Sequence, residues 1–371
     1  RKYKNMENNL HAEQRLKNLL FLVGQQGASD LHLVVGRHPT LRIDGKLVPI
    51  LQEKVLTPDD TKALSEVILT EEKKEELLAK GHSDFSYSFE ERARFRVNVF
   101  FQKGYVSVTM RFVMDRLRNL EELNVPSSLY NFAKYSQGLV LVTGPVGHGK
   151  STTLAAIIDF INHSYDKHIL TIEDPIEFVY NQDRCIINQR ENGRDANRFP
   201  EALRAVFRED ANVVLLGELR DLETIGTAMT AAETGHLIFA TLHTNDSSQT
   251  IDRIIDVFPA YQQNQIRSQL ASVLLGVISQ RLLPQVGGGR VPAVEIMFKN
   301  HAVENLIREN KVHQIDGVIE TSLKDGMVSL DRALAELVRR GLISVEDAFS
   351  YAKNQDYLQM IISKMAEQQG K

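Results

Sequence analysis

Hydrophobic and polar residues follow one pattern in the first third of the chain and another in the rest. Residues 84–89 and 95–112 alternate between apolar and polar side chains, which predicts strands of an antiparallel sheet. Leucines at helical spacing predict an amphipathic helix over residues 11–27, and the pair Asp44-Gly45 predicts a hairpin turn. We therefore expect residues 1–117 to form a small α+β domain.

A second pattern begins after the polar stretch 118–128, which contains Asn124 and Pro126 and is the expected linker. Four near-continuous apolar runs then alternate with helical segments, at Leu139–Val142, Ile169–Ile172, Val213–Leu216 and Leu237–Ala240. Such strands are typical of a parallel sheet that helices cover on both faces. Further helices are expected over Gln265–Leu283 and at the C-terminal end, so residues 129–371 should form an α/β domain with a helical end.

The composition excludes several classes of protein. Of the 371 residues 43% are hydrophobic and 25% charged, as in ordinary globular proteins, and the length favours two domains. The net charge of −4 argues against a nucleic-acid partner, and the single cysteine excludes an internal disulfide or a multi-cysteine zinc site. No apolar stretch reaches the roughly 18 residues that span a bilayer, and the polar residues 1–20 do not resemble a signal peptide. We expect a cytoplasmic protein without a transmembrane segment.

A phosphate-binding loop directly follows the first of these apolar runs. It has the pattern Gly-x-x-x-x-Gly-Lys-Ser between an expected strand and an expected helix, which is the order that a P-loop requires. Its glycines let successive N–H groups point at one anion, and the helix N-terminus adds a favourable dipole. The pattern predicts ATP as the ligand, with Lys150 at the β- and γ-phosphates and Ser151 on Mg²⁺. The expected contacts are Gly144, Pro145, Val146, Gly147, His148, Gly149, Lys150, Ser151 and Thr152.

Two later apolar runs end in carboxylates. Glu173, Asp174 and Glu177 follow one run, and Gly217-Glu218 follows another in the Walker B position. Because the carboxyl ends of parallel strands meet at one edge of a sheet, these acids are candidates to support Mg²⁺ and to orient or deprotonate water. For either site taken alone, a solvated loop is the alternative interpretation.

Four further residues are candidates for nucleotide contact. His236 and His243 flank the last apolar run, one at each end, and His243 fits a nucleotide-sensing role, with a hydrogen-bonded structural histidine as the alternative for either. Arg96 and Arg111 lie within expected strands of the first domain. They are either ion-pair partners or residues that approach a phosphate, as trans-acting arginines do in many P-loop oligomers.

These motifs occur in the order and at the spacing found in the secretion-type ATPases, the motors of type IV pili and type II secretion. The chain resembles this superfamily from about residue 16 to about residue 350. The motifs are Gly-Pro-Val-Gly-His-Gly-Lys-Ser-Thr-Thr-Leu, Ile-Glu-Asp-Pro-Ile-Glu, Gly-Glu-Leu-Arg-Asp-Leu-Glu-Thr and Thr-Gly-His-Leu-Ile-Phe-Ala-Thr-Leu-His-Thr-Asn. Within the superfamily, Ala28-Ser-Asp-Leu-His-Leu and the short first domain are similar to the pilus retraction branch. Pilus assembly ATPases typically carry a four-cysteine zinc site, which a single cysteine excludes.

The resemblance implies a PAS-like first domain and a RecA-like second domain, assembled as a homo-hexameric ring with nucleotide between the domains. It implies Glu177 as the general base and Glu218 as the Walker B acid that supports Mg²⁺ and its waters. His236 and His243 fall in the family's histidine box, and the two first-domain arginines match residues that approach the phosphates. The implied function is pilus retraction, with a pilus platform protein as partner at the cytoplasmic face of the inner membrane.

Three places depart from the family pattern. Val146 and His148 stand where the family usually has threonine and serine, and Asn212 lies where it has Asp-Pro-Asp. Glu304 inverts a charge within the retraction signature. This inversion keeps a second hypothesis open, an accessory or weakly active ring subunit that modulates another motor. A third hypothesis, a nucleic-acid motor on the same core, is disfavoured because the chain has no basic stripe with interleaved aromatics.

Overall fold

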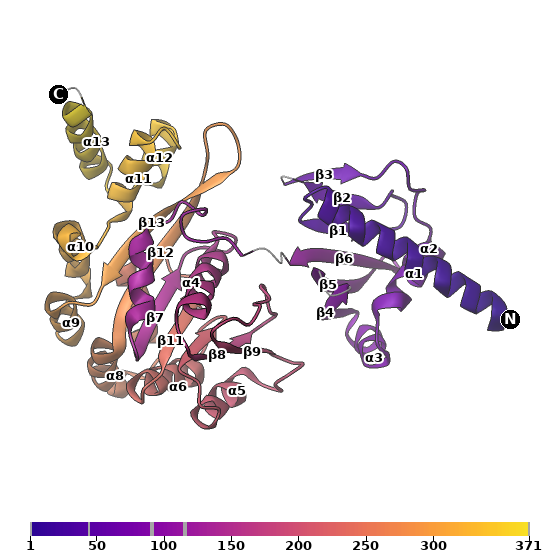
Figure 1. The fold of residues 1–371 in the computed structure, drawn as a ribbon, viewed down its shortest axis with the longest axis horizontal. Helices are drawn as coiled ribbons and strands as arrows, with labels where there is room; N and C mark the ends of the chain where they lie inside the picture. Colours follow the sequence, from indigo (N-terminus) through magenta and orange to yellow (C-terminus); the bar gives the residue numbers. More distant parts are fainter. Residues whose placement is uncertain (1, 44, 90–92, 114–116, 370–371) are drawn as a thin grey trace. The chain divides into compact units, whose positions relative to one another are not determined.

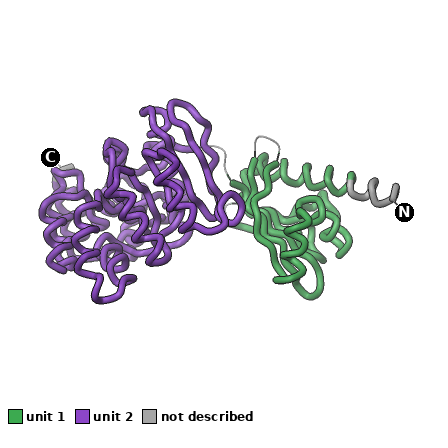
Figure 2. The backbone as a smooth tube through the Cα atoms, turned by 90° about the horizontal axis from the view of Figure 1, so that it is seen from below, with its two compact units in different colours: residues 1–116 green, residues 117–371 purple. Residues whose placement is uncertain are grey.

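The computed structural model contains two compact units, residues 1–116 and 117–371 (Figure 2). Each unit has a hydrophobic core of its own. The segment 118–128, expected as a linker, belongs to the second unit, where Leu120 and Val125 are buried in the core. Asp44 of the expected hairpin turn lies outside the described residues, which are 2–43, 45–89, 93–113 and 117–369.

The first unit is built on a six-stranded antiparallel sheet. The strands lie in the order β3-β2-β1-β6-β5-β4 (Figure 1). Alternation along β5 and β6 places Phe95, Val97, Val99 and Met110 on one face, where they form the core, and polar side chains on the other. The bounds are β1 Asp30–Leu33, β2 Thr40–Ile43, β3 Lys46–Pro49, β4 His82–Phe89, β5 Ala93–Gln102 and β6 Tyr105–Val113.

Three helices accompany this sheet, namely α1 (Lys2–Gln25), α2 (Pro58–Ile68) and α3 (Glu71–Lys80). The Thr57 hydroxyl accepts the N–H of Asp60, whose side chain bonds back to Thr57, so a capping box starts α2. Gly81 ends α3 in the left-handed conformation with a φ of 81°. The apolar stripe of α1 is buried in the core, as its spacing predicts, through Leu16, Leu19, Leu20 and Val23.

The second unit contains a seven-stranded sheet in the order β13-β12-β7-β11-β10-β8-β9. All neighbouring strands are parallel except β12 and β13. Every residue of β7, β10 and β11 is buried, so the sheet is covered on both faces, as the continuous apolar runs predict. The bounds are β7 Gly138–Thr143, β8 His168–Glu173, β9 Ile186–Glu191, β10 Val213–Leu216, β11 Leu237–Leu242, β12 Leu274–Pro284 and β13 Arg290–Phe298.

Helices connect and cover these strands (Figure 1). A 3₁₀ helix, η1 (Ser127–Lys134), precedes β7 and packs on α4. The α-helices are α4 (Lys150–Ser164), α5 (Phe199–Ala205), α6 (Leu222–Glu233), α7 (Ser247–Asp256), α8 (Ala260–Val273), α9 (His301–Arg308) and α10 (Ile315–Thr321). Together they give the alternating β and α order of a RecA-like core.

The expected helix over Gln265–Leu283 is wrong in its second half. Helix α8 ends at Val273, and β12 begins at Leu274 and pairs with both β7 and β13. The first seven residues of β12 are buried. A run that is buried on both faces has no periodicity to separate strand from helix, although the β-branched Val277 and Ile278 suit a strand.

Three helices form the C-terminal end, α11 (Leu330–Arg339), α12 (Val345–Tyr351) and α13 (Gln355–Gln369). They pack around a separate apolar cluster that also contains Leu283, Val291 and Ala293 from the far ends of β12 and β13. One hairpin therefore contributes to two cores, that of the sheet and that of the C-terminal helices.

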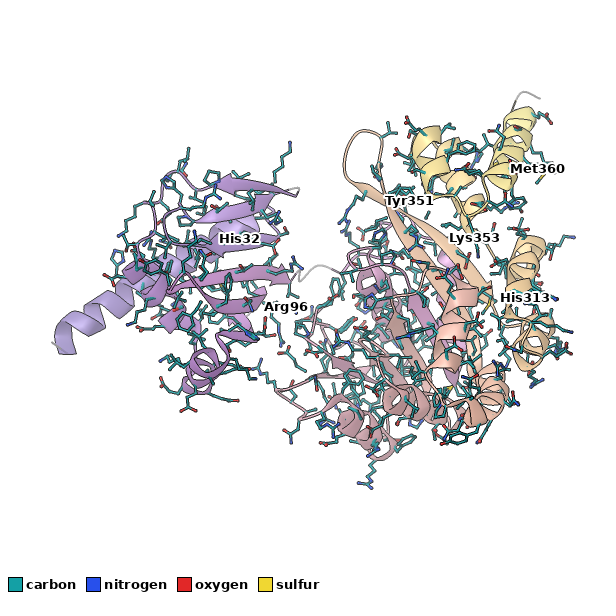
Figure 3. The ribbon with its side chains drawn as sticks, turned by 180° about the vertical axis from the view of Figure 1, so that it is seen from behind. His32, Arg96, His313, Tyr351, Lys353 and Met360 are labelled. Atoms are coloured by element: carbon teal, nitrogen blue, oxygen red, sulfur yellow. The ribbon has the colours of Figure 1, made fainter. Side chains whose placement is uncertain are left out.

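Polar contacts add to the attachment of these helices. The buried Asp331 carboxylate accepts the backbone N–H groups of Lys353 and Asn354 at 2.8 and 3.0 Å. The ammonium of Lys353, labelled in Figure 3, lies 2.7 Å from the Asp316 carboxylate on α10. Both contacts join the segment between α12 and α13 to elements that precede it in the chain.

Candidate functional site

The glycine loop joins β7 to α4 at the carboxyl edge of the parallel sheet. Gly149 has a φ of 81° and caps α4, so Lys150 and Ser151 begin the helix. A Cβ at Gly144, where φ is 140°, would lie 2.3 Å from the backbone oxygen of Gln280. Both positions therefore require glycine, the first for its left-handed backbone and the second also for the close approach of β12.

The Lys150 side chain is buried at the centre of this loop. The residue is 8% exposed, and Nζ donates to the carbonyl oxygens of Gly144 at 2.8 Å and Pro145 at 3.0 Å. Burial lowers the pKa of the ammonium, and the charges of Glu218 and Glu177 oppose that shift. Lys150 thus lies within electrostatic reach of both acids for which the sequence predicts a catalytic role.

His243 links Lys150 to Glu218. Lys150 Nζ lies 3.3 Å from His243 Nδ1, and His243 Nε2 lies 3.1 Å from Glu218 Oε1. Because an ammonium can only donate, Nδ1 is the acceptor, and the proton of the neutral ring is then on Nε2, which donates it to the carboxylate. Three residues from the start of α4 and from the ends of β11 and β10 therefore form one polar chain.

The ends of β8 and β10 meet closely at this edge. A Cβ at Gly217 would lie 3.3 Å from the Cα of Glu173, which brings the residues after β10 against the end of β8. Glu218 has a second partner in Arg220, whose Nε donates to Oε2 at 2.9 Å. The structure thus brings together the two strand-end groups of acids that the sequence singles out.

Glu173 and Glu177 have different environments. The buried Glu173 carboxylate accepts the Thr171 hydroxyl at 2.7 Å and the backbone N–H of Glu177 at 3.3 Å. Burial raises the pKa of Glu173 to about 7, and the charge of Glu177 adds to this rise. The Glu177 residue itself is exposed. Of these two glutamates, Glu177 is therefore the one that water can reach, and Glu173 holds its backbone.

Strand β12 holds the loop through Gln280, a residue that the sequence interpretation missed. Its side-chain amide accepts the Thr153 hydroxyl at 2.7 Å and donates to the carbonyl of His148 at 2.8 Å. One signal was present, since Gln280 is a polar residue inside an apolar run and buried polar groups need partners. Because a helix was expected in this segment, the sequence did not predict that Gln280 lies beside the loop.

The His148 ring also joins the loop to β12. Its Nδ1 accepts the backbone N–H of Leu282 at 3.0 Å. Burial, together with the positive charges of Arg281, Arg290 and Lys150, lowers the pKa of His148. The neutral ring that the Leu282 bond requires is therefore the form that this environment favours.

Three of the predicted residues lie on other elements of the fold. His236 precedes β11 and so lies at the amino end of the strand, where Nδ1 is 3.1 Å from the Ala231 carbonyl oxygen and the ring packs edge-on against Phe207. Arg96 and Arg111 are in the first unit, as direct partners on β5 and β6.

Two features are absent from the described residues. In that part of the chain, His, Cys, Asp and Glu side chains form no group of three or more that is arranged to hold a metal ion. The same residues include no helix with the length and apolar character needed to cross a bilayer.

The buried lysine within a glycine loop and the strand-end acids at one edge of a parallel sheet define a P-loop protein with a RecA-like core. The chain matches the family model for type II/IV secretion system proteins over residues 6–288, and it belongs to that family. It is 46% identical over 342 residues to the type IV pilus retraction ATPase PilT of Pseudomonas aeruginosa, covering 91% of this chain and 98% of that protein.

A second relative and a solved structure are also similar to this chain. A twitching motility protein of Neisseria gonorrhoeae is 50% identical over 274 residues, which are 74% of this chain and 73% of that protein. The crystal structure of the pilus retraction motor PilT with bound ADP superposes with a TM-score of 0.87 at 42% identity, covering 93% of this chain and 98% of the other. The RecA-like core, the smaller N-terminal domain and the helical C-terminal end expected from the sequence are confirmed.

Proposed function

We propose that this chain hydrolyses ATP to drive retraction of a type IV pilus, the pilin disassembly that underlies twitching motility. The observation that carries the proposal is the polar chain from Lys150 through His243 to Glu218, which ties the phosphate loop to the Walker B acid. The relatives support it, since one is named a pilus retraction ATPase and another a twitching motility protein. Identity of 46% over nearly the whole retraction ATPase favours the same reaction.

ATP is held at the glycine loop in this proposal. The backbone N–H groups of the loop from Gly144 to Thr152, where Pro145 has none, surround the phosphates, and Lys150 exchanges its two carbonyl partners for the β- and γ-phosphates. The residues present fit Mg²⁺, because the Ser151 hydroxyl and the Glu218 carboxylate are the hard oxygen ligands that this ion prefers. When bound, Mg²⁺ would neutralise charge on the β- and γ-phosphates.

Glu177 acts as the general base that takes a proton from the attacking water. Its exposure and its electrostatic reach to Lys150 support this role, and the bond from its N–H to Glu173 fixes the backbone that carries it. His243 donates a hydrogen bond to Glu218 while it accepts one from Lys150. When nucleotide binding changes the hydrogen bonds of Lys150, His243 therefore transmits the change to the Walker B acid Glu218. In this way His243 senses nucleotide.

The working assembly in this proposal is a homo-hexameric ring. Arg96 and Arg111 approach the phosphates, and His236 belongs to the histidine box of the assembled site. The ring sits at the cytoplasmic face of the inner membrane, peripheral to the membrane machinery, and acts on a pilus platform protein. The net charge of −4 argues against a nucleic-acid partner.

The second candidate function is an accessory or weakly active ring subunit that modulates another motor. Glu304 is the observation that favours it, because its charge is opposite to that of the residue in the retraction signature. On α9, Glu304 pairs with Arg308 one turn further on, so the inverted charge is partly used within the helix.

The ATPase rate of the purified chain with Mg²⁺, measured against protein concentration, tests the proposal. A specific activity that rises with concentration would support sites completed between subunits. Absence of hydrolysis at all concentrations, with ATP still bound, would favour the accessory subunit instead.

Two variants test the assigned roles. Lys150→Ala should abolish ATP binding, because it removes the buried ammonium that lies against the loop. Glu177→Gln should bind ATP with unchanged affinity and lose hydrolysis. Glu201→Gln, which neutralises an exposed acid on α5, is the matched control. Normal hydrolysis by Glu177→Gln would contradict its assignment as the general base.

A further inference from the structure

A row of charged residues crosses the sheet of the first unit. Arg42 on β2 is the direct partner of Asp30 on β1, Asp30 is the partner of Arg111 on β6, and Arg111 is the partner of Arg96 on β5. Direct partners on antiparallel strands carry their side chains on the same face of the sheet. These four residues, called here the arginine row, thus lie side by side on the face opposite the apolar core.

Asp30 holds two of the three guanidinium groups. It is 3% exposed, Oδ1 accepts Arg111 Nε at 2.9 Å, and Oδ2 lies 3.6 Å from Arg42 Nε. The Ser29 hydroxyl donates to Oδ2 at 2.7 Å and helps to fix the carboxylate. A buried carboxylate that binds two arginines restricts their rotamers, so less entropy is lost when they bind a further anion.

The guanidinium groups of the arginine row can still bind a further anion. The side chains of Arg111 and Arg42 are 65% and 35% exposed, and Arg96 is exposed as well. Among the described residues, the terminal nitrogens of Arg111 and the guanidinium of Arg96 have no recorded hydrogen-bond or ion-pair partner. One carboxylate neutralises one of three arginines, which leaves a positive surface of the kind that binds phosphate groups.

His32 lies beside the row, two residues along β1 from Asp30 and therefore on the same face (Figure 3 labels His32 and Arg96). Its Nε2 is buried and has no hydrogen-bond partner within the described part of the chain. Burial lowers the pKa of this ring, the charge of Asp30 opposes that shift, and the charges of Arg42 and Arg111 add to it. The environment therefore favours the neutral ring, which adds no positive charge to the row.

We propose that the arginine row binds the phosphates of a nucleotide, with Arg42 as a third phosphate-contacting residue beside Arg96 and Arg111, and with Asp30 as their positioning residue. This inference rests on the proposed function, because it extends the role given there to the two arginines. The sequence alone singled out neither Arg42 nor Asp30 as a site residue.

Hydrolysis kinetics of the full-length chain test Arg42. Arg42→Ala should lower kcat/KM for ATP about tenfold, the loss expected for one charge-assisted contact. Arg42→Lys should recover part of it, because the charge stays but the planar fork is lost. The matched control is Arg37→Ala, which removes the same charge from an exposed loop of the same unit. An Arg42→Ala chain that behaves like Arg37→Ala would overturn the proposal.

Asp30→Asn separates positioning from charge. The substitution makes the row more positive, so attraction by charge alone would lower the KM for ATP. If Asp30 positions two guanidinium groups, kcat should instead fall about tenfold without a lower KM. A lower KM with unchanged kcat would overturn the positioning role. Should Asp30→Asn fail to fold, the variants at the half-buried Arg42 still decide whether the row binds phosphate.

A binding experiment distinguishes this inference from the proposed function. Calorimetry with inorganic tripolyphosphate on the full-length chain needs no hydrolysis. Arg42→Ala should weaken binding about tenfold relative to Arg37→Ala. Equal binding by these two variants would overturn the arginine row as a phosphate site. A wild-type chain that does not hydrolyse ATP, with this difference intact, would refute the proposed function alone.

Discussion

Replacing Gln280 by leucine tests how strongly β12 holds the phosphate loop. The Gln280 side chain is 3% exposed and makes two hydrogen bonds, at 2.7 Å with the Thr153 hydroxyl and at 2.8 Å with the His148 carbonyl oxygen. Leucine has a similar volume, so packing changes little. The Thr153 residue is 1% exposed, however, and its hydroxyl loses its partner in the variant.

The size of the effect follows from these two bonds. A hydrogen bond contributes about 1 kcal/mol net, and a buried polar group left without a partner costs about 1–3 kcal/mol. Gln280→Leu should therefore lower the free energy of unfolding of the second unit by about 2–4 kcal/mol. Since the bond from Gln280 reaches the carbonyl of His148, the KM for ATP should rise as well.

A double-mutant cycle isolates the bond between the two side chains. Urea unfolding, followed by far-UV circular dichroism, is compared for wild type, Gln280→Leu, Thr153→Val and the double variant. We expect a coupling of about 1 kcal/mol, so that the double variant loses less than the sum of the single losses. Gln359→Leu, on the exposed surface of α13, is the control for adding an apolar side chain. Losses that add within about 0.3 kcal/mol would refute the reasoning.

Three more predictions follow from the site. His148→Asn should make the stability less sensitive to low pH. The environment lowers the pKa of the ring from 6.5, so the stability that the neutral ring contributes to the wild type is lost as pH falls below 6.5. Urea midpoints with the same pH dependence in both proteins would contradict this prediction. Glu173→Gln should act in the opposite direction. The pKa of Glu173 is raised from 4.5 to about 7, so the stability that the protonated side chain contributes to the wild type is lost as pH rises through this window. In thermal melts, the melting temperature of the variant should exceed that of the wild type at high pH, and the difference should shrink toward pH 4.5. A difference that stays constant with pH would count against the burial effect. His243→Ala should lower ATP turnover about tenfold, whereas His236→Ala should leave turnover within about twofold, because of these two histidines His243 is the one that contacts Lys150. Similar losses of turnover in both variants would argue against the polar chain.

The elements that carry the loop and the acids could be predicted from local sequence. Central parallel strands are buried on both faces, so they read as apolar runs, and the glycine loop and the acids directly follow such runs. Because parallel strands end at one edge, the sequence order alone brings Lys150, Glu177 and Glu218 to the same side of the sheet. These acids and the lysine do lie within electrostatic reach of one another.

What could not be predicted depends on contacts between distant segments. The Nδ1 of His243 lies beside Lys150, from which it is separated by 93 positions, and this depends on the neighbouring position of β7 and β11. Asp30 reaches Arg111 across 81 positions, which only the register of β1 and β6 reveals. The strand β12 was hidden by burial on both faces, and with it the role of Gln280.

The β12–β13 hairpin, which contributes to two apolar cores, limits where this protein can be truncated or recombined. Leu283, Val291 and Ala293 complete the apolar cluster of the C-terminal helices, while Gln280 on the same strand holds the phosphate loop. A truncation before α11 would leave those apolar side chains in water within a few residues of Gln280. Chimeras that exchange the C-terminal helices between relatives must therefore carry the β12–β13 hairpin with them, because the hairpin and the helices share one apolar cluster.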